Sequence, residues 1–268
     1  MDFDKQYFNL GLLDALSYKD TVVHRLDPRT KVIATLSFIA TVVSFPKYEI
    51  ARLVPFFLIP TVILILGDIP ARFLLRKVLI ASVFALLIGL FNPLLDTRPA
   101  FEFLGVPVSG GWLSFFSIIL RTLLTVSAVL LLISTTSFPG VAYALSRLGV
   151  PGAFISQLLF LYRYLFVLTE ETMRMVRARD LRSFGRRGRE AGVFSALVGT
   201  LFVRTVERAE RIHQAMLSRG FTGAIQSTRR YGFGINDLIC LSLTAAVLIL
   251  FRMYDPIAIL GMQAERIL

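Results

Sequence analysis

Cysteine and histidine are almost absent from this sequence. Its 268 residues include one cysteine, Cys240, and two histidines, His24 and His213. A single thiol excludes a disulfide framework and any multi-thiolate metal or iron–sulfur site within the chain. Two histidines so far apart in the sequence do not have the ligand spacing of a zinc site. We therefore expect no metal site in this chain and interpret Cys240 as an apolar packing residue.

A phosphate-binding loop is also missing. None of the five lysines is preceded by glycine, so the pattern G-x-x-x-x-G-K-[ST] does not occur. We expect no cofactor in this chain and no ATP hydrolysis by it, so that any energy must come from a partner. Lysine itself is absent after Lys77, and every later cation is an arginine. Because arginine is a rigid, multidentate donor, this bias favours docking onto protein.

Long hydrophobic runs are abundant. Hydrophobic residues make up 55% of the chain, charged residues 18%, and the mean hydropathy is +0.69. Several runs have the length of a membrane span, roughly 17 to 25 residues. A water-soluble fold cannot bury so much apolar surface in one core. The composition therefore predicts an all-α polytopic membrane protein with about five to six transmembrane helices and long amphipathic cytoplasmic helices.

The apolar runs and the loops between them predict an order of spans. Residues 1–24 lack the pattern of a cleaved signal peptide. Asp27 and Pro28 have the residue types of an N-cap and a first helical position. Residues 68–77 are expected to form a basic cytoplasmic loop, residues 96–111 an external loop, and residues 137–150 an amphipathic interfacial element. The expected spans are 32–45 and 51–66, joined as a helical hairpin, then 78–95, 112–135 and 238–251, with 151–169 either a sixth span or an embedded helix.

The distribution of charge predicts three parts. The formal net charge is +11, which cytoplasmic loops of a membrane protein explain better than nucleic-acid binding does. Residues 170–230 alone contain 13 arginines, no lysine and 6 acidic residues. We therefore divide the chain into N-terminal transmembrane helices (1–135), an interfacial and cytoplasmic region (136–235), and a C-terminal transmembrane helix with a tail (236–268).

The arginine-rich region contains an internal repeat offset by 37 residues. Steps of four place the repeated residues on one helical stripe, and Glu four residues before Arg adds roughly 0.2–0.5 kcal/mol per pair. Gly220 suits the left-handed position that ends a helix. The first copy is Glu170, Arg174, Ala178 and Arg182, followed by Ser183 and Phe184; the second is Glu207, Arg211, Ala215 and Arg219, followed by Gly220 and Phe221.

Each copy therefore predicts a helix that presents a small alanine and an arginine near its C-terminus. The alanine allows close approach to a partner, and the guanidinium can bind carboxylates or carbonyls in a groove. Two equal helix ends imply a partner with two related subunits or lobes. The alternative is a pair of amphipathic helices that lie on anionic lipid.

These motifs resemble those of a known family. Leu26-Asp27-Pro28-Arg29-Thr30-Lys31 and the paired Ala-x-x-x-Arg-Gly motifs resemble the transmembrane T component of energy-coupling factor (ECF) transporters, in its CbiQ, cobalt-type branch. The second motif, Ala215 to Gly220, matches fully, whereas the first has Ser183 in place of glycine.

The resemblance implies a non-catalytic coupling subunit in the cytoplasmic membrane of a prokaryote. Two cytoplasmic coupling helices would dock on two ABC ATPase subunits that bind ATP–Mg, with the motif arginines in their grooves. Motion of the ATPases would then reach a separate S-type membrane subunit that captures cobalt or nickel. A vitamin remains an alternative cargo.

Arg121 lies inside the predicted span 112–135, where a charge is costly unless it faces protein or water. It either bonds carbonyls or polar side chains such as Asn92 within this chain, or it pairs where a substrate-capture subunit packs. Together with the broken apolar segments, Arg121 and Asn92 also motivate a second hypothesis, a self-sufficient secondary carrier or membrane-bound enzyme.

Overall fold

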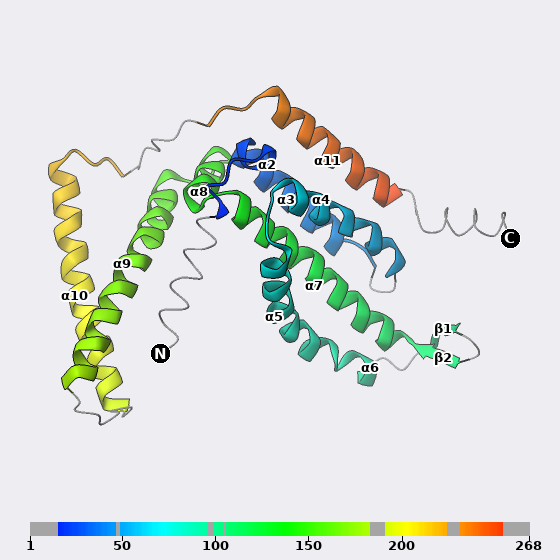
Figure 1. Ribbon diagram of the computed structural model, residues 1–268, viewed down its shortest axis with the longest axis horizontal. Helices are drawn as coiled ribbons and strands as arrows, with labels where there is room; N and C mark the ends of the chain where they lie inside the picture. The colour runs from blue at the N-terminus through cyan, green and yellow to red at the C-terminus, as the bar shows by residue number, and fades with distance from the viewer. Residues whose placement is uncertain are drawn as a thin grey trace. The chain divides into compact units, whose positions relative to one another are not determined.

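The computed structural model describes residues 16–46, 49–95, 99–103, 106–182, 191–223 and 231–253 (Figure 1). The chain divides into two compact units. We call Leu13–Ser137 with Tyr231–Leu268 the bundle, and the described part of Phe138–Arg230 the arginine-rich unit. Helices make up nearly all of the described secondary structure, which confirms the all-α prediction; one short β-hairpin is the exception.

The bundle is organised around α7, its longest helix, which packs against α3, α4 and α5, while α11 packs against α3 (Figure 1). The antiparallel hairpin pairs β1 with β2 within the segment that the sequence predicted as an external loop. The bundle elements are α2 (Val22–Arg25), α3 (Pro28–Val43), the 3-10 helix η1 (Ala51–Phe57), α4 (Leu58–Leu66), α5 (Ala71–Gly89), α6 (Asn92–Leu95), β1 (Pro99–Phe103), β2 (Val106–Ser109), α7 (Gly110–Thr135) and α11 (Ile235–Met253).

The beginning of α3 follows the predicted capping pattern. Asp27 is the N-cap, and one of its carboxylate oxygens accepts a hydrogen bond from the backbone N–H of Arg29 at 2.9 Å. Pro28 occupies the first helical position, where its missing N–H costs nothing. Local sequence therefore determines where the first long helix starts.

The predicted basic loop at 68–77 is wrong, because α5 already begins at Ala71 and ends at Gly89. Arg72 and Arg76 are four residues apart on its exposed side, while Leu74 is buried on the other side. Long cationic side chains can extend from a helix end to polar surroundings, so charge alone does not interrupt a helix there. The helix is thus shifted toward the N-terminus relative to the predicted span 78–95.

The core of the bundle is built from aromatic and aliphatic side chains that α7 brings together. The ring of Phe56, which is fully buried, contacts the rings of Phe38, Phe45 and Phe251 with centroids 5.3 to 6.2 Å apart. Gly89 allows α5 to approach α7, since a Cβ there would lie 2.9 Å from the ring of Phe115. The outward side of α5 exposes large apolar residues, as expected of a helix that faces lipid: Leu79, Ile80, Val83, Phe84, Leu87 and Ile88.

The arginine-rich unit contains α8 (Phe138–Arg147), α9 (Gly152–Arg182) and α10 (Ala191–Ser218). The predicted interfacial element at 137–150 is α8, which buries small residues and packs on α9. The segment 151–169 and the first repeat copy form one continuous helix, α9. By length and apolar composition, α7, α9 and α11 could each cross a membrane, and Ala51–Leu66 is a shorter apolar helix.

Candidate partner-docking site

The first repeat copy, from Glu170 to Arg182, lies in the C-terminal half of α9, and Arg182 is the final residue of this helix. Glu170 pairs with Arg174 at 3.7 Å, as the spacing of four predicts. Glu171 adds a second carboxylate, 3.2 Å from Arg174. Ala178 and Arg182 are exposed. Ser183, the last residue of the predicted site in this copy, lies outside the described residues.

The second copy ends α10 with a well-defined C-terminal cap. Gly220 has φ +80°, the left-handed conformation that the sequence predicted for it. Its N–H bonds the carbonyl of Leu217 at 3.0 Å, and the N–H of Phe221 bonds the carbonyl of Met216 at 3.0 Å. These two bonds are those of a Schellman motif, in which Arg219 is the C-cap residue. The helix end therefore presents Arg219 from a defined backbone geometry.

The same ion pair recurs in the second copy. Glu207 and Arg211 lie 3.8 Å apart, against 3.7 Å for the equivalent pair in the first copy. Ala215 and Arg219 are exposed, like their counterparts on α9. The four repeated residues, Glu, Arg, Ala and Arg, are thus alike in local structure in the two copies, from Glu170 to Arg182 and from Glu207 to Arg219.

Three interactions hold α10 against α9 as an antiparallel pair, in which the two helices cross (Figure 1). Glu171 of α9 forms an ion pair with Arg204 of α10 at 2.9 Å. Beyond the C-terminus of α10, the ring of Phe221 contacts that of Phe160, with centroids 6.2 Å apart. The Ser156 hydroxyl donates to the carbonyl of Gly223 at 3.0 Å. The C-terminus of α10 is therefore held at the N-terminal half of α9.

This arrangement puts Arg182 and Arg219 at opposite ends of the helix pair. The stretch of α9 from Phe160, where α10 ends, to Arg182 is roughly 33 Å long at ~1.5 Å per residue. The two arginines are therefore on the order of 30 Å apart. Such a separation is too large for one small ligand, so the two guanidinium groups can only act at two separate places.

The terminal arginines differ from most of their neighbours in their electrostatic environment. Arg174, Arg179, Arg204 and Arg211 all form ion pairs with acidic residues of the same unit. Within the described part of the chain, neither Arg182 nor Arg219 forms an ion pair or a side-chain hydrogen bond. Both are exposed, and both keep their donors available for a partner.

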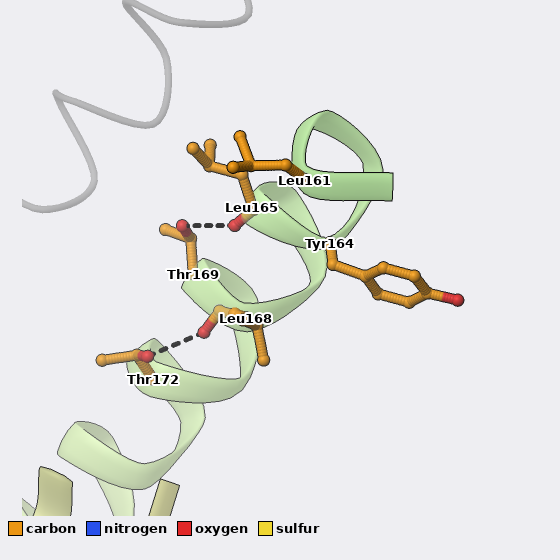
Figure 2. A pocket seen from close by; sticks show the side chains of 6 residues that line it. All are labelled: Leu161, Tyr164, Leu165, Leu168, Thr169 and Thr172. Atoms are coloured by element: carbon orange, nitrogen blue, oxygen red, sulfur yellow. Dashed lines mark hydrogen bonds between the residues drawn. The ribbon is translucent and has the colours of Figure 1, made fainter. Parts of the chain in front are cut away.

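The middle of α9 carries an open apolar groove of about 460 Å³ (Figure 2). The hydroxyl of Thr169 donates to the carbonyl of Leu165, and that of Thr172 to the carbonyl of Leu168, each at 2.7 Å. These hydroxyls are thereby satisfied within the helix, so the groove suits apolar side chains better than ions or phosphates. Its lining residues are Leu161, Tyr164, Leu165, Leu168, Thr169 and Thr172.

Comparison with known proteins decides the family. A family model described as "Cobalt transport protein", CbiQ, matches residues 19–231. The chain belongs to the CbiQ family. This match includes both repeat copies and the Leu26–Lys31 motif, the segments on which the resemblance rested.

Curated relatives extend the comparison. A relative from Heliobacterium modesticaldum, named energy-coupling factor transporter transmembrane protein EcfT, is 30% identical over 78% of this chain and 84% of its own length. An uncharacterized protein of Methanocaldococcus jannaschii is 28% identical over 87% of this chain and 83% of its own. A protein of Methanocorpusculum labreanum, whose name describes a fused cobalt transport protein CbiMQ, is 32% identical over 39% of this chain and 18% of its own. This CbiQ protein is therefore the transmembrane T component of an ECF transporter, a complex with other subunits.

Arg121 bonds backbone carbonyls in its own chain. Its Nη2 donates to the carbonyl oxygens of Phe45 at 2.8 Å and Pro46 at 2.7 Å, at the turn that follows α3. This geometry fits the alternative in which the charge is satisfied within the chain, although the partners are carbonyls and not Asn92. Both carbonyls lie just beyond the C-terminus of α3, where the helix dipole also favours a cation.

Sequence reasoning missed Asp237, a buried acid in the first turn of α11 that is 4% exposed. It accepts hydrogen bonds from the beginning of α3, more than two hundred residues earlier in the chain. An isolated acid at the start of an apolar run was the available signal, because such an acid needs donors nearby. Cys240 is half-buried, one turn further along α11. Within the described residues, no three His, Cys, Asp or Glu side chains cluster as metal ligands.

Proposed function

We propose that this T component is the coupling subunit of an ABC-type importer in the cytoplasmic membrane, docked on two cytoplasmic ATPase subunits. In this proposal, Arg182 enters a groove on one ATPase and Arg219 the equivalent groove on the other. Ala178 and Ala215 allow close approach beside each arginine. ATP–Mg binds only to the partners, and this chain performs no catalysis.

The observation that carries the proposal is the equivalence of two distant helix ends. Each ends a long helix, each has the Glu–Arg pair two turns before the alanine and arginine, and each leaves its last guanidinium exposed without a partner in the described residues. A lipid surface requires neither a repeated spacing nor matched ends. Two similar grooves on two related subunits require both.

The helix pair supplies a way to pass motion between subunits. Each arginine can donate to carboxylate or carbonyl oxygens of its ATPase, which fixes that end of the pair to one subunit. When ATP binding brings the two ATPases together, both ends of the pair must move. The apolar groove of α9 offers a surface on which a separate S-type membrane subunit can pack, so that the motion reaches the subunit that carries the cargo.

Cobalt is the cargo that we propose, with nickel as the alternative. The support is the description of the family model and the name of the fused relative, which both refer to cobalt transport. Uptake of radioactive cobalt and nickel by cells that express the complete transporter, each in competition with the other metal, separates the two. Preferential nickel uptake would overturn the cobalt assignment and leave the coupling proposal intact.

The double variant Arg182→Gln with Arg219→Gln tests the docking role. Each lost charge-assisted hydrogen bond weakens binding by about 1.5–3 kcal/mol, so we expect at least roughly a 100-fold lower affinity for the ATPases, no co-purification in mild detergent and no uptake. Arg72→Gln with Arg76→Gln is the matched control, because it removes two exposed arginines from the bundle. The control should assemble and transport normally.

Two results would count against the proposal. If the Arg182 and Arg219 double variant still assembled with the ATPases and supported uptake, the arginines would not be docking residues. If the purified chain alone transported a metal ion into liposomes, it would be a self-sufficient carrier and not a coupling subunit.

A further inference from the structure

Buried polar side chains from three distant parts of the sequence meet at one end of the bundle. We call Asp27, Thr30, Lys31, Thr135 and Asp237 the polar cluster. Each of these residues is at most 8% exposed. Buried polar groups are costly unless they are hydrogen-bonded, so their arrangement has to be specific.

Asp237 ties the beginning of α11 to the beginning of α3. Its Oδ1 accepts hydrogen bonds from the backbone N–H of Asp27 at 2.7 Å and from the Thr30 hydroxyl at 3.2 Å. Its Oδ2 accepts from the backbone N–H of Gly234 at 2.9 Å, which caps its own helix. One carboxylate therefore satisfies donors at the N-termini of two helices, where the helix dipole also favours a negative charge.

Lys31 ties the same end of α3 to the C-terminus of α7. Its Nζ donates to the carbonyl of Thr135, the last residue of α7, at 2.8 Å and to the carbonyl of His24 at 3.2 Å. A carbonyl in the last turn of a helix has no partner within the helix, and a cation there is favourable. The beginning of α3 thus holds both the end of α7 and the beginning of α11.

The polar cluster lies close to the two points where the chain passes between the bundle and Phe138–Arg230. The chain leaves the bundle after Ser137, two residues beyond Thr135, and re-enters it at Tyr231, six residues before Asp237. The two covalent connections between Phe138–Arg230 and the bundle are therefore anchored to α3 close to where they leave the bundle. A force on the arginine-rich unit therefore acts on these anchors before it can act on the other helices of the bundle.

We propose that Asp237 and Lys31 are positioning residues for coupling, which keep the end of α7 and the beginning of α11 fixed while the arginine-rich unit moves. This inference rests on the proposed coupling function. Without these hydrogen bonds, the last turn of α7 or the first turn of α11 unwinds when the arginine-rich unit moves. The ATP-driven motion then no longer reaches the other helices of the bundle. The loss is one of coupling, not of ATPase docking.

The test compares ATP hydrolysis with metal uptake in the complete transporter reconstituted in liposomes. The variants are Asp237→Asn, which keeps the shape of the side chain but loses its charge and one acceptor, and Lys31→Met, which removes the donor. We expect normal assembly with the ATPases, ATP hydrolysis within about twofold of wild type, and at least a tenfold decrease in metal transported per ATP hydrolysed. Lys31→Arg, which can donate to the same carbonyls, should restore at least half of the wild-type ratio.

Asp68→Asn is the matched control, because it neutralises an exposed acid of the same bundle that pairs with Lys19. The amount of metal transported per ATP hydrolysed should be the same in this variant as in the wild type. Thr30→Val removes one hydrogen bond to Asp237 and should lower the ratio in the same direction by less, which keeps the test valid if Asp237→Asn does not fold.

An unchanged ratio in both Asp237→Asn and Lys31→Met would overturn the inference, as would a proportional loss of assembly, hydrolysis and uptake, which marks a merely structural role. Failure of the proposed function is distinguishable from either result. In that case the wild-type chain would not assemble with ATPases, or the Arg182 and Arg219 double variant would remain active.

Discussion

Substitution of alanine for glycine should stabilise α10 at one position, Gly199, and destabilise its C-terminal end at another, Gly220. Gly199 lies inside the helix, and Gly220 lies just beyond its end with φ +80°. An added Cβ would meet no atom within 4 Å at either position. The substitution to alanine therefore changes only the backbone preference, without steric contacts that would confuse the comparison.

The expected magnitudes follow from that preference. Alanine inside a helix is more stable than glycine by about 0.5–1 kcal/mol, so Gly199→Ala should slow local opening of α10 by roughly two- to fivefold. Alanine in the left-handed conformation costs about 1–2 kcal/mol, so Gly220→Ala should open the last turn roughly 5- to 30-fold more often. Arg219 would then leave its defined position, although the arginine itself is unchanged.

Hydrogen–deuterium exchange of the full chain in detergent measures both effects. The backbone amides around Gly199 report on Gly199→Ala. The amides of Arg219, Gly220 and Phe221 report on Gly220→Ala, because each bonds a carbonyl of the last turn. Gly220→Asn is the control, since asparagine tolerates the left-handed conformation and should exchange nearly as wild type does. Equal or slower exchange in Gly220→Ala would refute the capping geometry and, with it, the defined presentation of Arg219.

Three further predictions concern the bundle. Arg121→Met removes the hydrogen bonds to the carbonyls of Phe45 and Pro46 and should lower the free energy of unfolding by about 2 kcal/mol in detergent; an unchanged value would contradict these bonds. Leu124→Ala, at a fully buried position, should cost about 2–5 kcal/mol, whereas Leu79→Ala, at a 62% exposed position, should cost far less in the same denaturation assay; similar losses would contradict the core. Burial lowers the pKa of His24, and the nearby charges of Lys31 and Lys19 lower it too. The unfolded chain therefore binds this proton more readily than the folded chain does, so Tm should fall as the pH drops below about 6.5. His24→Gln should weaken this dependence of Tm on pH. If the variant and the wild-type chain had the same profile of Tm against pH, His24 would not be the cause.

The division of α9 and α10 into unlike halves has a consequence for where they can lie. Their N-terminal halves carry exposed apolar residues such as Phe154, Leu161, Phe194 and Phe202, and their C-terminal halves carry the ion-paired repeat. In an antiparallel pair, the apolar half of one helix lies beside the charged half of the other. Each end of the pair thus combines an apolar surface with a charged helix tip.

The all-α class, the beginning of α3 at Asp27 and Pro28, the extent of α7 and the end of α10 at Gly220 were predicted from the sequence alone. These features depend on local rules, namely hydrophobic run length, N-cap residues and a glycine in the left-handed conformation. Local rules failed at α5, because the charged residues of 68–77 were interpreted as a loop although a helix begins at Ala71. They also did not predict the hairpin of β1 and β2, which lies within the predicted loop 96–111.

Only the tertiary structure decided which distant groups meet. Asp237 bonds Asp27 across 210 positions, Arg121 bonds carbonyls just beyond the end of α3, and the terminal arginines of two related motifs lie at opposite ends of one helix pair. Such contacts depend on which apolar faces pack together and in what register, and many packings satisfy one hydrophobic pattern equally well. The sequence alone therefore determined the helices and the arginine-ended repeats, whereas the folded chain decided what those ends can reach and what holds them in place.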